Sequence, residues 1–284
     1  LVRHLHPSIE SAAHPDSISY ERPSNPMHTL TRTVRFAVGT GSDARGVNGF
    51  AGNPHVRGLD RHYELHVSCR GTVDPITGYL IDIKAIDRAV RDRVVPLFDR
   101  AVTTNTAPAA VLAQTLDTLR ALPAPLLAVR LFLTPYHSIE MAAMDPSTVL
   151  FRQRFDFSAA HRLHSPSLSD DDNRRLYGKC NNPRGHGHNY VVEPAVRCKP
   201  DTLTLADLEA ITDRVIIQPF DHKHLNEDTD EFNVAKGGVL PSVENIAQVF
   251  FTRLAPALAQ HPSKPTLERI TVWETDRTCA TYPS

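Results

Sequence analysis

The chain has 284 residues, of which 31 are basic and 32 acidic, so its formal net charge is −1. This length allows about two ordinary domains, and the balanced charge argues against a nucleic-acid-binding protein held by a broad basic field. No apolar run is long enough for a membrane span, and we expect neither a signal peptide nor a membrane partner. The four cysteines lack the spacing of a disulfide framework, which predicts a cytoplasmic location.

The first half of the chain predicts strands followed by helices. Residues 1–30 show no periodicity and predict a disordered lead-in. Alternating apolar residues predict strands in "TVRFAVGT" (33–40) and "YELHVSCR" (63–70). These strands are followed by a turn at "DPITG" (74–78) and a short strand into Asp82. A helix comes next, with apolar residues at Ile83, Ile86, Val90 and Val94. A second helix in "APAAVLAQTLDTLRAL" and a last strand in "VRLFLT" (129–134) complete this half.

The second half repeats this order. Strands are predicted in "FDFSAAH" (155–161) and "NYVVEPAVRC", a helix after the N-cap Thr204, a second helix in "PSVENIAQVFFTRLAPAL" and a strand in "ITVWET" (270–275). Residues 49–70 align without gaps on 178–199, and "VVPLFDR" aligns on "IIQPFDH". We therefore predict an α+β chain of two tandem β-β-α-α-β-β domains, 31–144 and 147–284, each an antiparallel sheet with two helices on one face.

Three histidines of the second half form a candidate metal site. His186 and His188 are separated by one glycine, so on a strand both imidazoles point to the same face. His161 ends a neighbouring predicted strand. Three imidazoles with an open fourth position favour a catalytic zinc site. The alternative that the cluster alone leaves open is a hydrogen-bonded His-Gly-His turn.

The aligned halves differ at the positions that could carry chemistry. These pairs are His161 and Thr40, Cys180 and Ala51, His186 and Arg57, His188 and Leu59, His222 and Arg100, and Glu274 and Leu133. The shared positions belong to the scaffold, whereas all six of these differ. The comparison favours one copy with a site and one copy without a metal site.

The second half resembles the 6-pyruvoyltetrahydropterin synthase family, which has the tunnelling fold. The resemblance rests on "FSAAH", "GKCNNPRGHGHNY", "FDHKHLN", "PSVENIA" and "VWETD", in this order. The first half resembles the same fold through "VDPITGYLIDIKAID". The resemblance implies Zn²⁺ on His161, His186 and His188, and 7,8-dihydroneopterin triphosphate as the substrate. It also implies that Cys180, Asp221 and His222 are catalytic and that Glu274 anchors the pterin.

Residue chemistry suggests a role for each of these groups. A thiol beside a metal ionises readily, so Cys180 could accept a proton, and His222 oriented by Asp221 could shuttle it. Because Asp221 and His222 are adjacent, a joint role requires a turn. The Glu274 carboxylate could accept two hydrogen bonds from a pterin edge. Glu244 either lines the pterin pocket or stabilises the N-terminus of its helix.

The expected function is therefore that of a zinc-dependent lyase, which eliminates triphosphate to give 6-pyruvoyltetrahydropterin. The alternative is a 6-carboxytetrahydropterin synthase of queuosine biosynthesis, which cleaves the side chain of the same substrate and releases acetaldehyde. The C-x₅-H-x-H spacing of "CNNPRGHGH" favours the first. A non-catalytic pterin-binding or scaffold protein is a further alternative. The resemblance also implies a homo-oligomer with sites at domain or subunit interfaces, because assembly would close open sheet edges.

Overall fold

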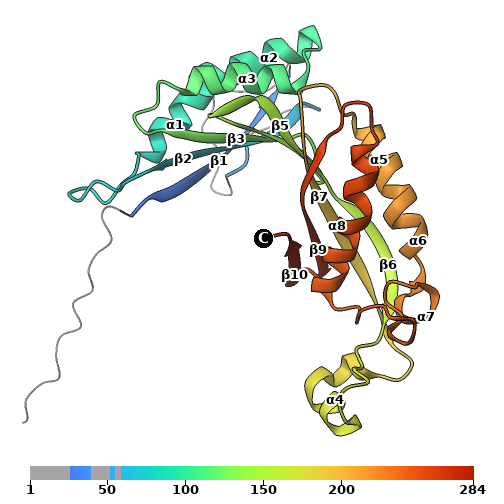
Figure 1. Cartoon of the computed structure of the whole chain (residues 1–284). Coiled ribbons are helices and arrows are strands. Elements are labelled where there is room, and N and C mark those ends of the chain that lie inside the picture. The colour runs from blue at the N-terminus through green and yellow to red at the C-terminus, as the bar shows by residue number, and fades with distance from the viewer. Residues whose placement is uncertain (1–25, 40–51, 55–58) are drawn as a thin grey trace, which may run out of the picture.

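The computed structural model describes residues 26–39, 52–54 and 59–284 (Figure 1). The positions Thr40, Ala51 and Arg57, used in the comparison of the two halves, lie outside the described residues. Within the described ranges no helix is long and apolar enough to cross a membrane.

The described first half contains four strands and a set of helices. The strands are β1 (His28–Val38), β2 (Arg61–Gly71), β3 (Leu126–Phe132) and β4 (His137–Ala142). The helices are α1 (Ile83–Ala89), a π-helical stretch (Val90–Val94), α2 (Val95–Thr104) and α3 (Pro108–Leu119).

The second half follows the same order with additional short elements. Its strands are β5 (Asp145–Gln153), β6 (Phe155–His161), β7 (His186–Cys198), β8 (Lys223–His224), β9 (Thr266–Thr275) and β10 (Thr278–Tyr282). Its α-helices are α4 (Asp170–Tyr177), α5 (Leu205–Thr212), α6 (Gln218–Phe220), α7 (Leu225–Asp228) and α8 (Val243–Ala259). A π-helical stretch (Asp213–Ile217) and two 3₁₀ turns (Gly178–Asn181 and Val234–Lys236) complete it.

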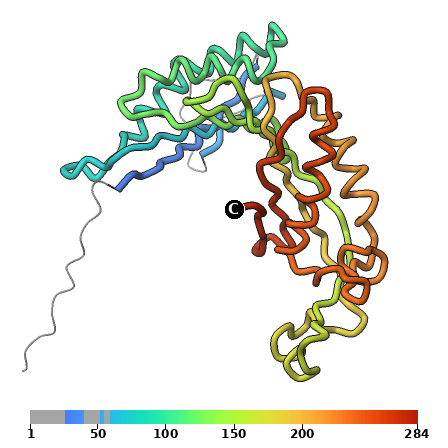
Figure 2. Tube along the Cα trace, viewed as in Figure 1, coloured from blue at the N-terminus to red at the C-terminus, as the bar shows by residue number. Residues whose placement is uncertain are grey.

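All ten strands belong to one curved sheet. The strands follow the order β1-β2-β3-β4-β5-β7, and β6, which continues β5 after Arg154, also pairs with β7. The other edge of β7 pairs with β9, which pairs with β10. Each pairing is antiparallel except the short parallel contact between β6 and β8. The chain is thus a mixed α/β protein in which the two halves share a sheet, and the helices lie on its outer, convex side (Figures 1 and 2).

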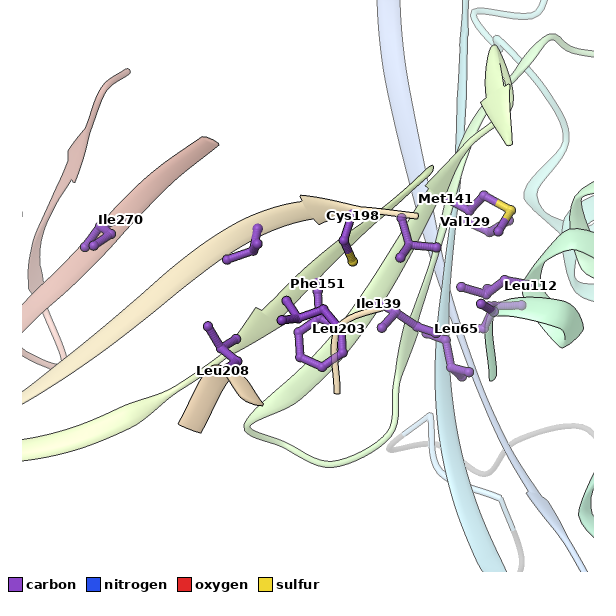
Figure 3. Packing of buried hydrophobic residues seen from close by; sticks show 14 of the residues in the cluster. Leu65, Leu112, Val129, Ile139, Met141, Phe151, Cys198, Leu203, Leu208 and Ile270 are labelled. Carbon is purple, nitrogen blue, oxygen red and sulfur yellow. The ribbon is translucent and has the colours of Figure 1, made fainter. Parts of the chain in front are cut away.

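The hydrophobic core is continuous across the junction between the halves. Figure 3 shows buried residues of β3 and β4, such as Val129 and Ile139, near Phe151 of β5 and Cys198 of β7. Cys69 and Cys198 are both buried and all four cysteines are free. The predicted boundary at Asp145-Pro146 is the start of β5, which directly follows a tight turn. The two halves are therefore joined by a β-hairpin, β4–β5, and not by a linker of the kind that separates independent domains.

Two predictions in the first half are wrong in detail. The lead-in was predicted to reach residue 30, but β1 begins at His28 because residues 28–30 pair with Cys69–Gly71 of β2. Residues before 26 lie outside the described part. The short strand into Asp82 does not form. The turn predicted before it does form, and the Asp74 side chain closes it by accepting from the main-chain N–H groups of Ile76 and Thr77. Asp82 instead caps α1.

Helix caps in the second half agree with the sequence. Thr204 and Asp207 form a reciprocal capping box at the start of α5. Ser242 caps α8 through the N–H of Asn245. At the corresponding helix of the first half, α3, the N-cap is Ala107 and no side chain makes a capping bond.

Candidate metal centre

His161 lies at the end of β6, where its side chain is fully buried. Its Nδ1–H donates to the main-chain carbonyl of Pro241 over 2.7 Å. Because a carbonyl only accepts, the proton stays on Nδ1 and the lone pair of Nε2 is free. Burial lowers the pKa of His161 to about 4. The ring is therefore neutral at neutral pH, as a metal ligand must be.

His186 and His188 at the start of β7 complete a cluster of three imidazoles. The strand register places His186 opposite His161 and His188 opposite Ala159. The Nε2 atoms of His161 and His186 are 3.2 Å apart, and one nitrogen of each of the three rings lies within 4.8 Å of the others. Burial also lowers the pKa of His186. The structure thus brings the three predicted ligands together.

The 3.2 Å between Nε2 of His161 and Nε2 of His186 fits two ligands of a tetrahedral metal ion. Zinc–nitrogen bonds of about 2.0–2.1 Å in a tetrahedron hold two ligand atoms roughly 3.3 Å apart. Nε2 of His188 and Nδ1 of His186 are both buried, and neither has a hydrogen-bond partner among the described residues. A buried nitrogen without a partner is costly in a protein unless a proton donor or a cation satisfies it. The donor set is therefore suited to a divalent cation.

A glycine turn sets the approach of β7 to the cluster. Gly185 has φ +69°, and its N–H donates to the carbonyl of Asn182 over 2.8 Å. A Cβ at this position would lie 2.8 Å from the carbonyl oxygen of His161 and 2.6 Å from Nε2 of His224. Glycine is required here both for the backbone conformation and for the close contact.

Glu274 reaches the imidazole cluster from β9. Its Oε1 lies 3.5 Å from Nε2 of His161 and 3.6 Å from Nε2 of His188. The predicted site residue on β9 therefore lies beside two of the three candidate ligands, with its side chain mostly buried.

Cys180 lies in the 3₁₀ turn that precedes the histidine strand. Its carbonyl accepts from the N–H of Leu163, which follows His161 by two residues, so the turn is tied to the end of β6. Burial, and after it the charge of Glu274, raises the pKa of the Cys180 thiol. The readily ionised thiol that the sequence suggested therefore depends on a cation beside Cys180, because its burial and the Glu274 carboxylate both disfavour the thiolate.

Asp221 and His222 meet at a turn, as their adjacency required. His222 has φ +56°, and its Nδ1 lies 2.7 Å from Oδ2 of Asp221. The other carboxylate oxygen of Asp221 accepts from the N–H of Ser158, whose carbonyl accepts from the N–H of His222. The Ser158 hydrogen bond and then His222 lower the pKa of Asp221. The pair is thereby anchored to β6.

The structure does not bring all predicted site residues together. Across the described residues, the Asp221–His222 pair makes no hydrogen bond or ion pair with Cys180, and the His222 side chain is 81% exposed. His222 lines an open groove with Ser158, His188 and His224. Glu244 is exposed in the first turn of α8, a position that stabilises the helix N-terminus and makes no contact with the cluster.

Sequence reasoning missed two residues that contact His161. Pro241 supplies the carbonyl that orients His161, and the Tyr190 hydroxyl lies 3.4 Å from the same Nδ1. The spacing of Tyr190, two residues after His188, places it on the same strand face and could have indicated its role. The hydrogen bond of His161 to the Pro241 carbonyl joins residues 80 positions apart, so no local pattern in the sequence predicts it.

A sheet that gathers three imidazoles, a carboxylate and a thiol at one end defines a candidate metal-dependent enzyme of the α/β class. Residues 151–284 match the model of the 6-pyruvoyl tetrahydropterin synthase family. The chain is 44% identical over 131 residues to 6-pyruvoyl tetrahydrobiopterin synthase of Poecilia reticulata, a match that covers 44% of this chain and 84% of the relative. The chain belongs to the 6-pyruvoyl tetrahydropterin synthase family.

Further matches cover the same half. The human 6-pyruvoyl tetrahydrobiopterin synthase is 40% identical over 135 residues, which is 46% of this chain and 88% of the relative. The solved structure of Caenorhabditis elegans 6-pyruvoyl tetrahydropterin synthase is 33% identical, with a TM-score of 0.41, and covers 48% of this chain and 94% of that one. The family model begins at residue 151, so residues 1–150 lie outside its match.

Proposed function

We propose that the chain is a zinc-dependent lyase that converts 7,8-dihydroneopterin triphosphate into 6-pyruvoyltetrahydropterin by eliminating triphosphate. The observation that carries the proposal is the cluster of three imidazoles in a half that is 44% identical over 131 residues to a 6-pyruvoyl tetrahydrobiopterin synthase. The names of these relatives favour the pyruvoyl product over the 6-carboxytetrahydropterin product. The four free cysteines agree with a cytoplasmic enzyme.

Nε2 of His161 and of His186, with a ring nitrogen of His188, would hold the Zn²⁺ ion. The 3.2 Å separation of the first two and the unpartnered buried nitrogen of the third support this assignment. Bound zinc would polarise the side-chain oxygens of the substrate and acidify the adjacent C–H bonds.

Glu274 and Cys180 would act on the substrate beside these ligands. The Glu274 carboxylate would accept hydrogen bonds from the N–H groups of the pterin edge, which fixes the ring. Cys180 as thiolate would take the proton from a side-chain carbon, and the electron pair of that C–H bond would expel triphosphate from the neighbouring carbon. Burial and Glu274 raise the pKa of the thiol, so Cys180 requires the nearby cation to ionise at neutral pH. Glu244 is the weakest member of the proposed substrate-binding set, because it is exposed.

Asp221 and His222 would relay the proton, and their position supports a site shared between subunits. In one chain they make no hydrogen bond or ion pair with Cys180 within the described part, although they are firmly anchored to each other and to Ser158. Strands β1 and β10 are each paired on one side among the described strands. A homo-oligomer that closes these edges would bring residues of one subunit to the site of another.

The first half is proposed to be a tunnelling-fold copy without a metal site. Its order of elements matches that of the second half, including a π-helical stretch directly before a helix with an early proline, Pro96 or Pro219. Leu133 stands where Glu274 stands in the second half, and the described Leu59, aligned with His188, is fully exposed. We therefore expect about one zinc ion per chain.

Incubation of the zinc-loaded protein with 7,8-dihydroneopterin triphosphate tests the function directly. We expect release of inorganic triphosphate and a product with the mass of 6-pyruvoyltetrahydropterin. Acetaldehyde with 6-carboxytetrahydropterin would support the queuosine-route alternative. Binding of the pterin without any turnover would contradict the lyase proposal and favour a pterin-binding protein.

A further inference from the structure

The face of the sheet opposite the helices carries charged side chains near the junction of the halves. The register places Arg130 of β3 opposite Glu140 of β4, and Phe132 opposite Ser138. Ser138 in turn lies opposite Arg152 of β5. Because alternate residues of a strand share a face, these five side chains lie together. Their neighbours Val129, Leu131, Ile139 and Phe151 point into the core beneath the helices.

Arg130 is held in place on this face without an acidic partner. Its Nε donates to the Ser138 hydroxyl over 2.9 Å, and its guanidinium carbon lies 4.4 Å from the centre of the Phe132 ring. These are the contacts of the side chain among the residues that the structure describes, and they leave both terminal amino groups without an acceptor. The side chain is partly buried, so its orientation is fixed by packing and by one hydrogen bond.

Other arginines on the same face are paired with carboxylates. Arg35 donates to Glu64 over 2.6 Å and Arg154 to Glu193 over 2.9 Å. Arg152, whose side chain is 6% exposed, donates to Glu140 over 3.1 Å. Glu140, the acid directly across from Arg130, therefore serves a different cation. Glu193 and Glu140 act on Arg130 through their charge and raise its pKa, but among the described residues neither makes an ion pair with it, so its terminal amino groups have no carboxylate partner.

The surroundings of Arg130 favour the arrival of an anion. Burial, and after it the positive charge of Arg152, lowers the pKa of Arg130 to about 10. A partly dehydrated guanidinium that faces a second one gains from a bound anion, and the terminal amino groups of arginine form a fork suited to two oxygens of an oxyanion. A phosphate dianion is favoured over a carboxylate, because its higher charge interacts more strongly with several neighbouring guanidinium groups.

We propose that the terminal amino groups of Arg130, beside Arg152 and over Phe132, form a binding site for a phosphate-type oxyanion. The ligand is inorganic phosphate or a short polyphosphate, bound on the face of the sheet opposite the candidate zinc ligands. The proposed site is formed by side chains of β3, β4 and β5, and it does not depend on the proposed lyase activity.

Titration of the zinc-loaded full chain with inorganic phosphate and with tripolyphosphate, followed by calorimetry at low ionic strength, tests this site. Arg130→Gln is expected to weaken binding roughly tenfold or more, the effect of losing hydrogen bonds to a charged group. Arg130→Lys keeps the charge but loses the fork, and it should also weaken binding. Arg35→Gln is the matched control, since Arg35 lies on the same face but is already paired, and it should leave the affinity nearly unchanged.

Four results would overturn the proposal. Three of them are an absence of binding to the unchanged protein, equal affinity in Arg130→Gln, and an equal loss in Arg35→Gln, which would show that binding depends only on the overall charge of this face. Binding should also survive in His186→Ala, and its loss there would place the anion at the metal and reject the Arg130 site. Turnover of the pterin by Arg130→Gln is read separately, so failure of the lyase proposal would not affect the outcome.

Discussion

The two halves of the sheet share the same order of elements but differ in the residues that could bind a metal ion. In each, paired strands, a helix with a π-helical stretch and a second long helix precede a pair of closing strands. The second half gathers His161, His186 and Glu274 at one end of its strands. The first half has Leu133 at the place of Glu274. Under the proposal that the first half is a copy without a metal site, the scaffold tolerates loss of the site residues, because the hydrophobic positions, and not the metal ligands, determine the fold.

The largest expected effect concerns the chemistry of the second half, at Cys180. Cys180→Ala should lower kcat by roughly 10²–10⁴-fold, the contribution typical of a general base, while zinc content and folding are retained. Cys279→Ala is the control, because Cys279 is exposed on β10. Steady-state kinetics of both variants would check this. Equal activity in the two variants would remove Cys180 from the mechanism.

Loss of a core aromatic ring tests whether the halves unfold as one unit. Phe98 and Phe220 occupy aligned positions and both are buried. Phe98 packs against Phe36 and Tyr63, and Phe220 against Phe232 and Phe250. Each Phe→Ala change should lower the free energy of unfolding by about 3–5 kcal/mol, as measured by urea denaturation.

The number of unfolding transitions then distinguishes one cooperative unit from two independent domains. A shared sheet and a continuous core predict a single transition that shifts in both variants. Phe98→Ala should also leave the zinc content unchanged. Two separate transitions, with only one shifted in each variant, would show instead that the halves are independent domains.

Helix capping provides the smallest contrast between the halves. Ser242 caps α8, whereas α3 begins at Ala107 without a side-chain cap. Ser242→Ala should lower the free energy of unfolding by about 1 kcal/mol, and Ala107→Ser should raise it by up to about the same amount. Thermal denaturation of both variants would measure this. A destabilising Ala107→Ser would indicate that the start of α3 cannot accept a cap.

Much of the architecture followed from local patterns in the sequence. The alternation in "YELHVSCR" and "FDFSAAH", the 3.6-residue periodicity before Phe98, and the Thr204 cap each depend on near neighbours, and the structure confirms them. The spacing of His186 and His188 likewise predicted their common face.

The remaining features depend on contacts between distant residues. Helix α4 forms in the polar segment "SDDDNRRLY", where Asn173 is fully buried and its amide donates to the carbonyls of Ser165, Leu168 and Ser169. The segment has no apolar periodicity that would predict this helix. The extension of β1 to His28 needs its partner β2, and the orientation of His161 needs the carbonyl of Pro241. The raised pKa of Cys180 depends on its burial and then on Glu274, which lies far along the chain.

The content of zinc per chain tests the central claim most directly. After dialysis against metal-free buffer, elemental analysis of the purified protein should give about one zinc ion per chain, and His186→Ala should lose it. The matched variant His66→Ala changes a histidine of the first half, on β2, and should keep the metal. A ratio near two would contradict a first half without a metal site. A metal-free native protein, or a His186→Ala variant that retains zinc, would contradict the assignment of the three imidazoles.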